Sequence, residues 1–144
     1  MDKWRYLKIG DVAELKAGKG LAKNNFHDKG IFPVYGANGL LGWSDRCLFE
    51  SPVVIIGRVG ACGEIHRTTG PAWISDNALA AWPKPNVNGR FLYYLLKSRD
   101  FSPIVGGTTQ PLINQSSIKK LTVPIPSSVE QQAIADILGS LDDK

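Results

Sequence analysis

The chain is poor in the side chains that most often bind metals or form cross-links: its 144 residues include two cysteines and two histidines. Two cysteines are too few for a disulfide framework, and Cys47 and Cys62 lack the C-x-x-C spacing of metal and redox sites. We expect both to be reduced thiols in a cytoplasmic protein. His27 and His66 lie too far apart to show metal-ligand spacing, so the sequence predicts no metal site.

Long apolar runs are missing as well. No stretch approaches the roughly 20 apolar residues that a membrane-spanning helix needs, and the first residues, MDKWRYLKIGDVAEL, lack the basic and apolar regions of a signal peptide. We therefore expect a cytoplasmic chain without a membrane partner. Its length and its 43% hydrophobic content are typical of one domain with its own core.

Motifs of catalysis are also missing. The stretch AGKGLAKN resembles a phosphate loop, but Lys19 is followed by Gly20 where the motif requires Ser or Thr. A G-x-S-x-G nucleophile elbow is absent, and so is the Asn/Asp-Pro-Pro-aromatic tetrapeptide of amino-methylating enzymes. We expect no catalytic residue and no cofactor bound by this chain.

Positive charge dominates most of the sequence. Residues 1–126 carry 16 Lys and Arg against 9 Asp and Glu, a net charge of +7, whereas residues 127–144 carry one Lys against four acids, a net charge of −3. A basic body can displace counterions from a phosphate backbone, so nucleic acid is a candidate partner. A basic protein without that partner remains the alternative.

Short apolar runs broken by Gly, Pro, Asn or Asp predict strands in the segments IFPVYG, RCLFE, PVVIIGR, GEIHR, AWIS and ALAAWP. GDVAEL predicts a helical turn with Asp11 as its N-cap, and residues 16–30 predict a long basic loop. NGRFLYYLLKSRD has helical periodicity with Asn88 as a cap. We expect an α+β fold, with a small irregular, mostly antiparallel sheet or partial barrel and a few short helices.

The C-terminal residues predict an amphipathic helix after a proline-framed edge strand, TVPIP. Ser127 with Glu130, or Ser128 with Gln131, would form its capping box. The expected division is therefore a domain over residues 1–126 and a helix over 127–144. The helix carries an apolar stripe, which would either pack on the body or pair with another helix in a coiled-coil-like arm: Ile134, Ile137, Leu138 and Leu141.

The predicted loops are rich in side chains that suit duplex DNA. Lys and Arg can hold phosphates or guanine, Asn and Gln can pair with adenine, and aromatic groups can touch a thymine methyl. Thr108, Thr109 and Gln110 would either contact DNA or cap the short helix that follows. The candidate DNA-binding residues are Lys16, Lys19, Lys23, Asn24, Asn25, Tyr35, Asn38, Trp43, Arg46, Arg58, Arg67, Thr108, Thr109 and Gln110.

An ordered series of segments carries a family resemblance across essentially the whole chain. The series runs through WRYLKIGDVAELKAGKG, GIFPVYGANGLLG, PVVIIGRVGACGEIH, GPAWISDNALAAWP, NGRFLYYLLKS, GGTTQPLINQSSIKKLTVPIP and EQQAIADILGSLDDK. It resembles one target recognition domain, with the start of the conserved helix, of the DNA specificity (S) subunit of type I restriction-modification systems.

The resemblance implies a non-catalytic module that reads one half of a split double-stranded DNA target. Such subunits carry two recognition domains joined by long helices that hold the methyltransferase subunits, with S-adenosylmethionine, ATP and Mg on partner subunits, including the restriction subunit. This sequence departs from that pattern, because it holds one domain and a few turns of one helix. It would be a truncation, a half-size subunit that forms a homodimer through its C-terminal helix, or a half whose partner is encoded separately.

Two other functions stay open at this point. The same module occurs as the recognition domain of fused type II restriction-methylation enzymes. A protein-interaction module without specific DNA binding is the remaining alternative, and salt-independent binding would favour it.

Overall fold

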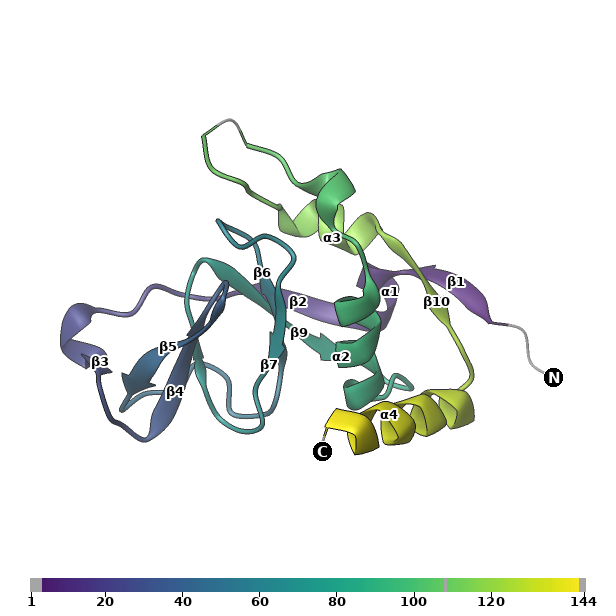
Figure 1. The fold of residues 1–144 in the computed structure, drawn as a ribbon, viewed down its shortest axis with the longest axis horizontal. Helices are drawn as coiled ribbons and strands as arrows, with labels where there is room; N and C mark the ends of the chain where they lie inside the picture. The colour runs from purple at the N-terminus through teal and green to yellow at the C-terminus, as the bar shows by residue number, and fades with distance from the viewer. Residues whose placement is uncertain (1–3, 108, 143–144) are drawn as a thin grey trace.

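The computed structural model describes residues 4–107 and 109–142. Figure 1 shows a sheet-rich lobe on the left, the helices on the right, and a loop that projects at the top. In chain order the elements are β1 (Arg5–Lys8), α1 (Ile9–Val12), β2 (Ala13–Ala17), η1 (Lys23–Asn25), β3 (Phe26–His27), β4 (Phe32–Gly36), β5 (Gly39–Ser44), β6 (Val54–Gly57), β7 (Ile65–Arg67), β8 (Trp73–Ile74), β9 (Ala78–Pro83), α2 (Gly89–Ser98), η2 (Ser102–Ile104), α3 (Gln115–Lys120), β10 (Thr122–Ile125) and α4 (Ser128–Asp142).

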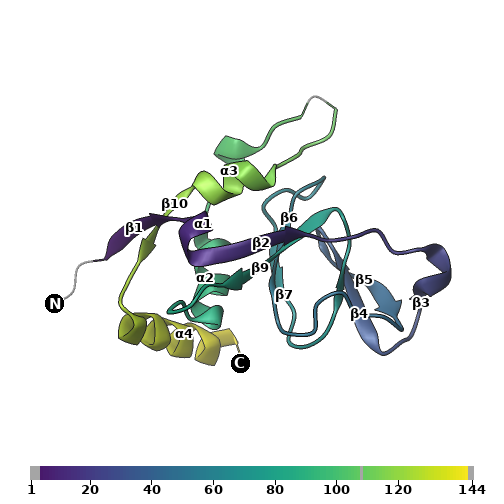
Figure 2. The same ribbon diagram turned by 180° about the vertical axis from the view of Figure 1, so that it is seen from behind.

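The described strands form three sheets, with the orders β2-β9-β6-β7, β3-β5-β4-β8 and β1-β10. Among these strands, β4 and β8 form the parallel pair and the other pairs are antiparallel. The predicted α+β fold, with mostly antiparallel sheets and a C-terminal helix, is confirmed. Figure 2, from behind, shows β2 crossing from the helices toward the second sheet.

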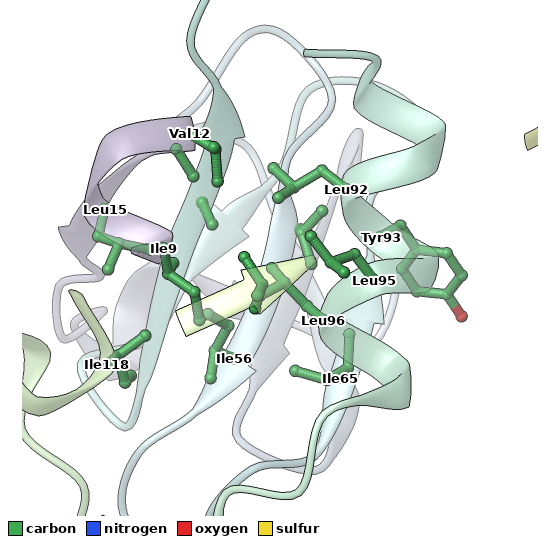
Figure 3. Packing of buried hydrophobic residues seen from close by; sticks show 14 of the residues in the cluster. Ile9, Val12, Leu15, Ile56, Ile65, Leu92, Tyr93, Leu95, Leu96 and Ile118 are labelled. Carbon is green, nitrogen blue, oxygen red and sulfur yellow. The ribbon is translucent and has the colours of Figure 1, made fainter. Parts of the chain in front are cut away.

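Strands β6 and β9 are buried on both faces, which explains their continuous apolar sequences. Because successive side chains point to opposite faces of a strand, Val54 and Ile56 join the larger cluster under α2, while Ile55 faces a smaller cluster between the two four-stranded sheets. Figure 3 shows the larger cluster, where Leu92 and Leu96 of α2 lie over this sheet. The two clusters share strands, so the two sheets pack as one body.

Helix α2 is capped as the sequence predicts, since the Asn88 side chain accepts a hydrogen bond from the Phe91 N–H at 2.9 Å. The first helix differs from its prediction. Helix α1 begins at Ile9, and Asp11 lies in its first turn, where its carboxylate accepts from the Lys8 N–H at 3.2 Å. The prediction of Asp11 as the N-cap and of a helix up to Leu15 is wrong, because residues from Ala13 onward pair with β9.

Three further expectations need correction. The segment 39–44, which is not among the predicted strands, forms β5 between β3 and β4. Within RCLFE, Phe49 makes an isolated bridge to Ala72 in place of a strand. The expected loop over residues 16–30 begins with the end of β2 and contains η1 and β3.

Helix α4 packs against α2. Ser127 and Glu130 form the predicted cap: the Glu130 N–H donates to Ser127 Oγ at 3.3 Å, and the Ser127 hydroxyl donates to the Glu130 carboxylate at 3.1 Å. Gln131 is buried and bridges two main-chain groups, since its amide donates to the Pro126 carbonyl at 3.0 Å and its oxygen accepts from the Asn88 N–H at 2.8 Å. The helix is therefore fixed to the body along its first turns.

The division of the chain at residue 126 stays a prediction. Strand β10 ends at Ile125 and α4 begins at Ser128. Ala135 of α4 belongs to the larger core cluster, so this part of the helix shares the core of the preceding residues.

Candidate nucleic-acid interface

The loop over residues 105–112 projects from the body beside the turn between β6 and β7 (Figure 1). Gly106 and Leu112 exchange two main-chain hydrogen bonds of 2.7 and 3.0 Å, which close the loop at its base. Gly107 has φ +97°, and a Cβ there would overlap the Gln110 carbonyl, so glycine is required at this position. Thr109 and Gln110 are exposed on this closed loop.

Main-chain bonds also join the 105–112 loop to the β6–β7 turn. The Gly60 N–H donates to the Pro111 carbonyl at 3.0 Å, and the Ile113 N–H donates to the Arg58 carbonyl at 2.8 Å. Arg58 is half-buried, and its Nε donates to the Asp76 carbonyl at 2.9 Å. Since a guanidinium has five N–H donors, Arg58 is oriented by this bond and keeps donors for an anion.

The main chain of Lys19 is held against β8, which shortly precedes Asp76 in the chain. Its N–H donates to the Ile74 carbonyl at 2.9 Å, and its carbonyl accepts from the Trp73 indole at 2.8 Å. The Lys19 side chain is exposed. Lys19 and Arg58 are thus both attached to the stretch from β8 to the start of β9.

Helix α3 adds two lysines that the candidate set did not include. Gln115 donates its amide to the Leu15 carbonyl at 3.1 Å, which places α3 next to the exposed Lys16 of β2. Lys119 and Lys120 are exposed and line a surface hollow of about 480 Å³ with Gln115. The sequence signal was the KK pair in the last turn of a short helix, which equally suits a helix C-terminus.

We call these five cations the basic surface: Lys16, Lys19, Arg58, Lys119 and Lys120. Thr109 and Gln110 lie next to it through the bonds at Arg58 and Gly60. The alternative role of these two residues as caps of α3 is wrong, because Asn114 caps that helix by accepting from the Ser117 N–H at 2.7 Å. Thr108 lies outside the described residues.

A second group of candidates lies on the β3-β5-β4-β8 sheet. Asn38 is exposed in the β4–β5 turn, and the adjacent Ala37 carbonyl lies against Gly57 at the end of β6, so Asn38 is near the basic surface. Lys23, Asn24 and Asn25 form η1 farther out, toward the left end of Figure 1.

The aromatic members of this second group are partly structural. Trp43 pairs with Pro33 and His27 in the sheet and is half-buried. Tyr35 packs against the smaller core cluster. The guanidinium of Arg46 lies 5.8 Å from the Trp73 ring centre, within cation–π range, and its side chain is exposed.

Arg67 lies apart from the other candidates. It pairs with Val54 at the start of β6, whereas Arg58 follows the end of that strand at Gly57. Its guanidinium stacks 4.5 Å from the Tyr93 ring centre and lies 3.9 Å from the Asp142 carboxylate of α4. The structure therefore separates Arg67 from the basic surface.

The predicted apolar stripe of α4 is divided between two environments. Ile134 and Leu138 are half-buried, and Ile134 packs on the core, whereas Ile137 and Leu141 are each 63% exposed. The face toward α2 carries Gln131, Ala135 and Gly139 instead. Helix α4 both packs on the body and presents Ile137 and Leu141 outward.

The surroundings shift the pKa of one thiol and of one carboxyl described above. Burial raises the pKa of the Cys62 thiol, which donates to the Arg58 carbonyl at 3.3 Å, and both cysteines are free. The Trp4 indole donates to Glu130 at 2.9 Å and holds the pKa of that carboxyl below its ordinary value. Within residues 4–107 and 109–142, three or more His, Cys, Asp or Glu side chains nowhere gather as a metal site, and helices there are too short or too polar to cross a membrane.

The sequence of this chain is similar to the sequences of several curated proteins. It is 24% identical over 139 residues to the type I restriction enzyme EcoprrI specificity subunit of Escherichia coli, covering 93% of this chain and 35% of the relative. It is 42% identical over 100 residues to the type I restriction enzyme MjaIX specificity subunit of Methanocaldococcus jannaschii, covering 67% and 23%. The chain thus spans about a third or less of these proteins.

A solved structure has the same fold. The type I restriction-modification system S subunit from M. genitalium superposes with a TM-score of 0.88 at 24% identity, over 97% of this chain and 39% of that one. The family model for the type I restriction modification DNA specificity domain matches residues 1–144. With its sequence, fold and relatives in agreement, the chain belongs to the type I restriction modification DNA specificity domain family.

Proposed function

We propose that this chain is a DNA-recognition module of a type I restriction-modification system and reads one half of a split double-stranded target. The observation that carries the proposal is the attachment of the closed 105–112 loop, and of Ile113 directly after it, to Gly60 and Arg58 at the edge of the basic surface. Cations of this kind hold phosphates and set register, while a Gln amide on a loop closed at its base can pair with an adenine edge in the major groove.

The basic surface and the 105–112 loop have different roles in this proposal. The basic surface binds the phosphates of any sequence, and Thr109 and Gln110 contact bases, with Asn38 at the side of the site. Lys23, Asn24, Asn25, Trp43 and Arg46 extend the contact along the second sheet. Arg67 is left out because it lies at the other end of β6, against α4.

The chain itself performs no chemistry in this proposal. Methylation belongs to a methyltransferase subunit with S-adenosylmethionine, and cleavage to a restriction subunit with ATP and Mg. Ile137 and Leu141 lie on the outward side of α4 and would contact a partner helix, either of a second copy or of another subunit.

The test is to express the chain with its methyltransferase subunit in a methylation-deficient bacterium and to map modified adenines by single-molecule sequencing. We expect one split motif, which is palindromic if two copies pair. Substitution of Gln110 by Ala should change the motif at one position. A stable complex that modifies no defined motif would contradict the proposal.

A further inference from the structure

A cavity of about 380 Å³ opens on the domain away from the 105–112 loop, between the start of β6, the end of β9 and the first turns of α2. Its volume lies in the range of sites that accept one or two large side chains or a small ligand. The residues around it are Pro52, Val53, Val54, Arg67, Thr68, Thr69, Ala81, Pro83, Gly89, Arg90 and Tyr93.

The floor of the cavity is apolar. Val53, Val54 and Ala81 are at most 6% exposed; Val54 lies in β6, Ala81 lies in β9, and Val53 directly precedes β6. Thr68 is also buried, and its hydroxyl is occupied by the main chain of Val53, from which it accepts at 2.8 Å. The floor therefore favours an apolar group.

The rim of the cavity is positively charged. Arg67 and Arg90 both line it, and among the described residues no Asp or Glu does. The first N–H groups of α2, at Gly89 and Arg90, have no acceptor within the helix, and Gly89 is part of the lining. The positive end of the α2 dipole lies at the same place. The cavity is thus complementary to an apolar group that carries a negative charge.

Both arginines are held in position by α4. Arg90 donates to the Ala135 carbonyl at 3.1 Å and lies 3.4 Å from the Asp136 carboxylate, while Arg67 lies between Tyr93 and Asp142. These ion pairs are exposed and weak, so an anion in the cavity can compete for the same guanidinium groups. An anion bound in the cavity therefore weakens the contacts of Arg67 and Arg90 with α4.

We propose that this cavity is the docking site for a segment of a partner protein that presents a large apolar side chain flanked by acidic residues. The apolar side chain fills the space over Val54 and Ala81, and the carboxylates bind Arg67 and Arg90. Charge complementarity and the apolar floor carry this inference, and neither depends on DNA reading. Duplex DNA is disfavoured as the occupant because its phosphates carry no apolar group that could enter.

The test uses the ¹⁵N-labelled chain and the probe peptide acetyl-Glu-Phe-Glu-amide, followed by amide chemical shifts. We expect saturable shifts at Val54, Thr69 and Gly89. The peptides acetyl-Gln-Phe-Gln-amide and acetyl-Glu-Gly-Glu-amide should bind at least ~10-fold more weakly, because each lacks one half of the recognised chemistry.

Single substitutions test whether the cavity itself binds the peptide. Thr69→Trp fills the mouth of the cavity, keeps both arginines, and should abolish the shifts. Arg90→Gln should weaken binding by about 10-fold through loss of a charge-assisted contact. Arg99→Gln is the matched control, because Arg99 is an exposed arginine at the opposite end of α2 and does not line the cavity.

Three results would overturn the inference: no saturable shifts in the folded parent chain, equal binding of the Gln peptide, or unchanged binding in Thr69→Trp. A short duplex that shifts the same amides more strongly than the peptide would also overturn it, in favour of phosphate binding. The outcome is independent of the methylation experiment, since a chain that reads no motif can still bind the peptide.

Discussion

The salt dependence of DNA binding follows from the basic surface. If each of its five cations neutralises one phosphate, the logarithm of the binding constant falls with the logarithm of the salt concentration with a slope of about −4.5 from this chain alone. Lys119→Gln together with Lys120→Gln removes two contacts and should make the slope shallower by about 1.8. Over a fourfold rise in salt, the parent should therefore lose about 12-fold more affinity than the double variant.

Fluorescence anisotropy with a labelled duplex that carries the mapped motif measures both slopes. The chain is studied with its methyltransferase partner, because contacts made by the partner cancel in the difference. Arg5→Gln is the control: Arg5 is exposed on β1, away from the basic surface, and should leave the slope unchanged. Equal slopes for parent and double variant, or an equal change with Arg5→Gln, would refute the placement of phosphates on α3.

Three more outcomes are expected. Gln110→Ala should lower discrimination at one base pair by about 10- to 100-fold while the salt slope stays the same, measured by competition with single-base variants of the target; a uniform loss for all sequences would contradict a base contact. Gln131→Ala should lower the free energy of unfolding by about 2 kcal/mol in urea titrations, because the main-chain groups of Pro126 and Asn88 lose their partner; a change within error would show that water replaces the amide. The pKa of Glu130 is lowered from 4.5 on folding, so its contribution is present above pH 4.5 and is lost as pH falls through the folded-state value; Glu130→Gln should lower the thermal midpoint at neutral pH but not in stronger acid, and an equal loss at both would contradict the linkage.

Local patterns predicted the parts of the fold that depend on few long-range contacts. The apolar runs predicted β6 and β9, and the helical periodicity predicted α2. In these segments the local sequence alone shows which residues are buried. Strand β5 was missed because GLLGWS carries two glycines and no alternation, and it pairs only because β3 and β4 flank it. Asp11 was misplaced for a related reason, since pairing with β9 ends the first helix early.

The sequence predicted the types of residue in the site better than it predicted which of these residues lie close together. Arg58 and Gln110 are 52 residues apart in the sequence, and the bonds between the 105–112 loop and the β6–β7 turn bring their segments together. Arg67 has the same residue type as Arg58 and follows it by nine residues, yet it lies at the other end of the strand pair. A sequence pattern does not show how far apart Arg58 and Arg67 lie in the folded domain.

The frame of the 105–112 loop consists of main-chain bonds, from Gly106 to Leu112, from Gly60 to Pro111 and from Ile113 to Arg58. Such bonds form with almost any side chain, apart from the glycine that the turn at Gly107 requires. The exposed positions 109 and 110 are therefore free to exchange one residue for another while the loop keeps its shape. A scaffold of this kind can acquire a new binding preference by single substitutions at its tip, without a compensating change elsewhere in the domain.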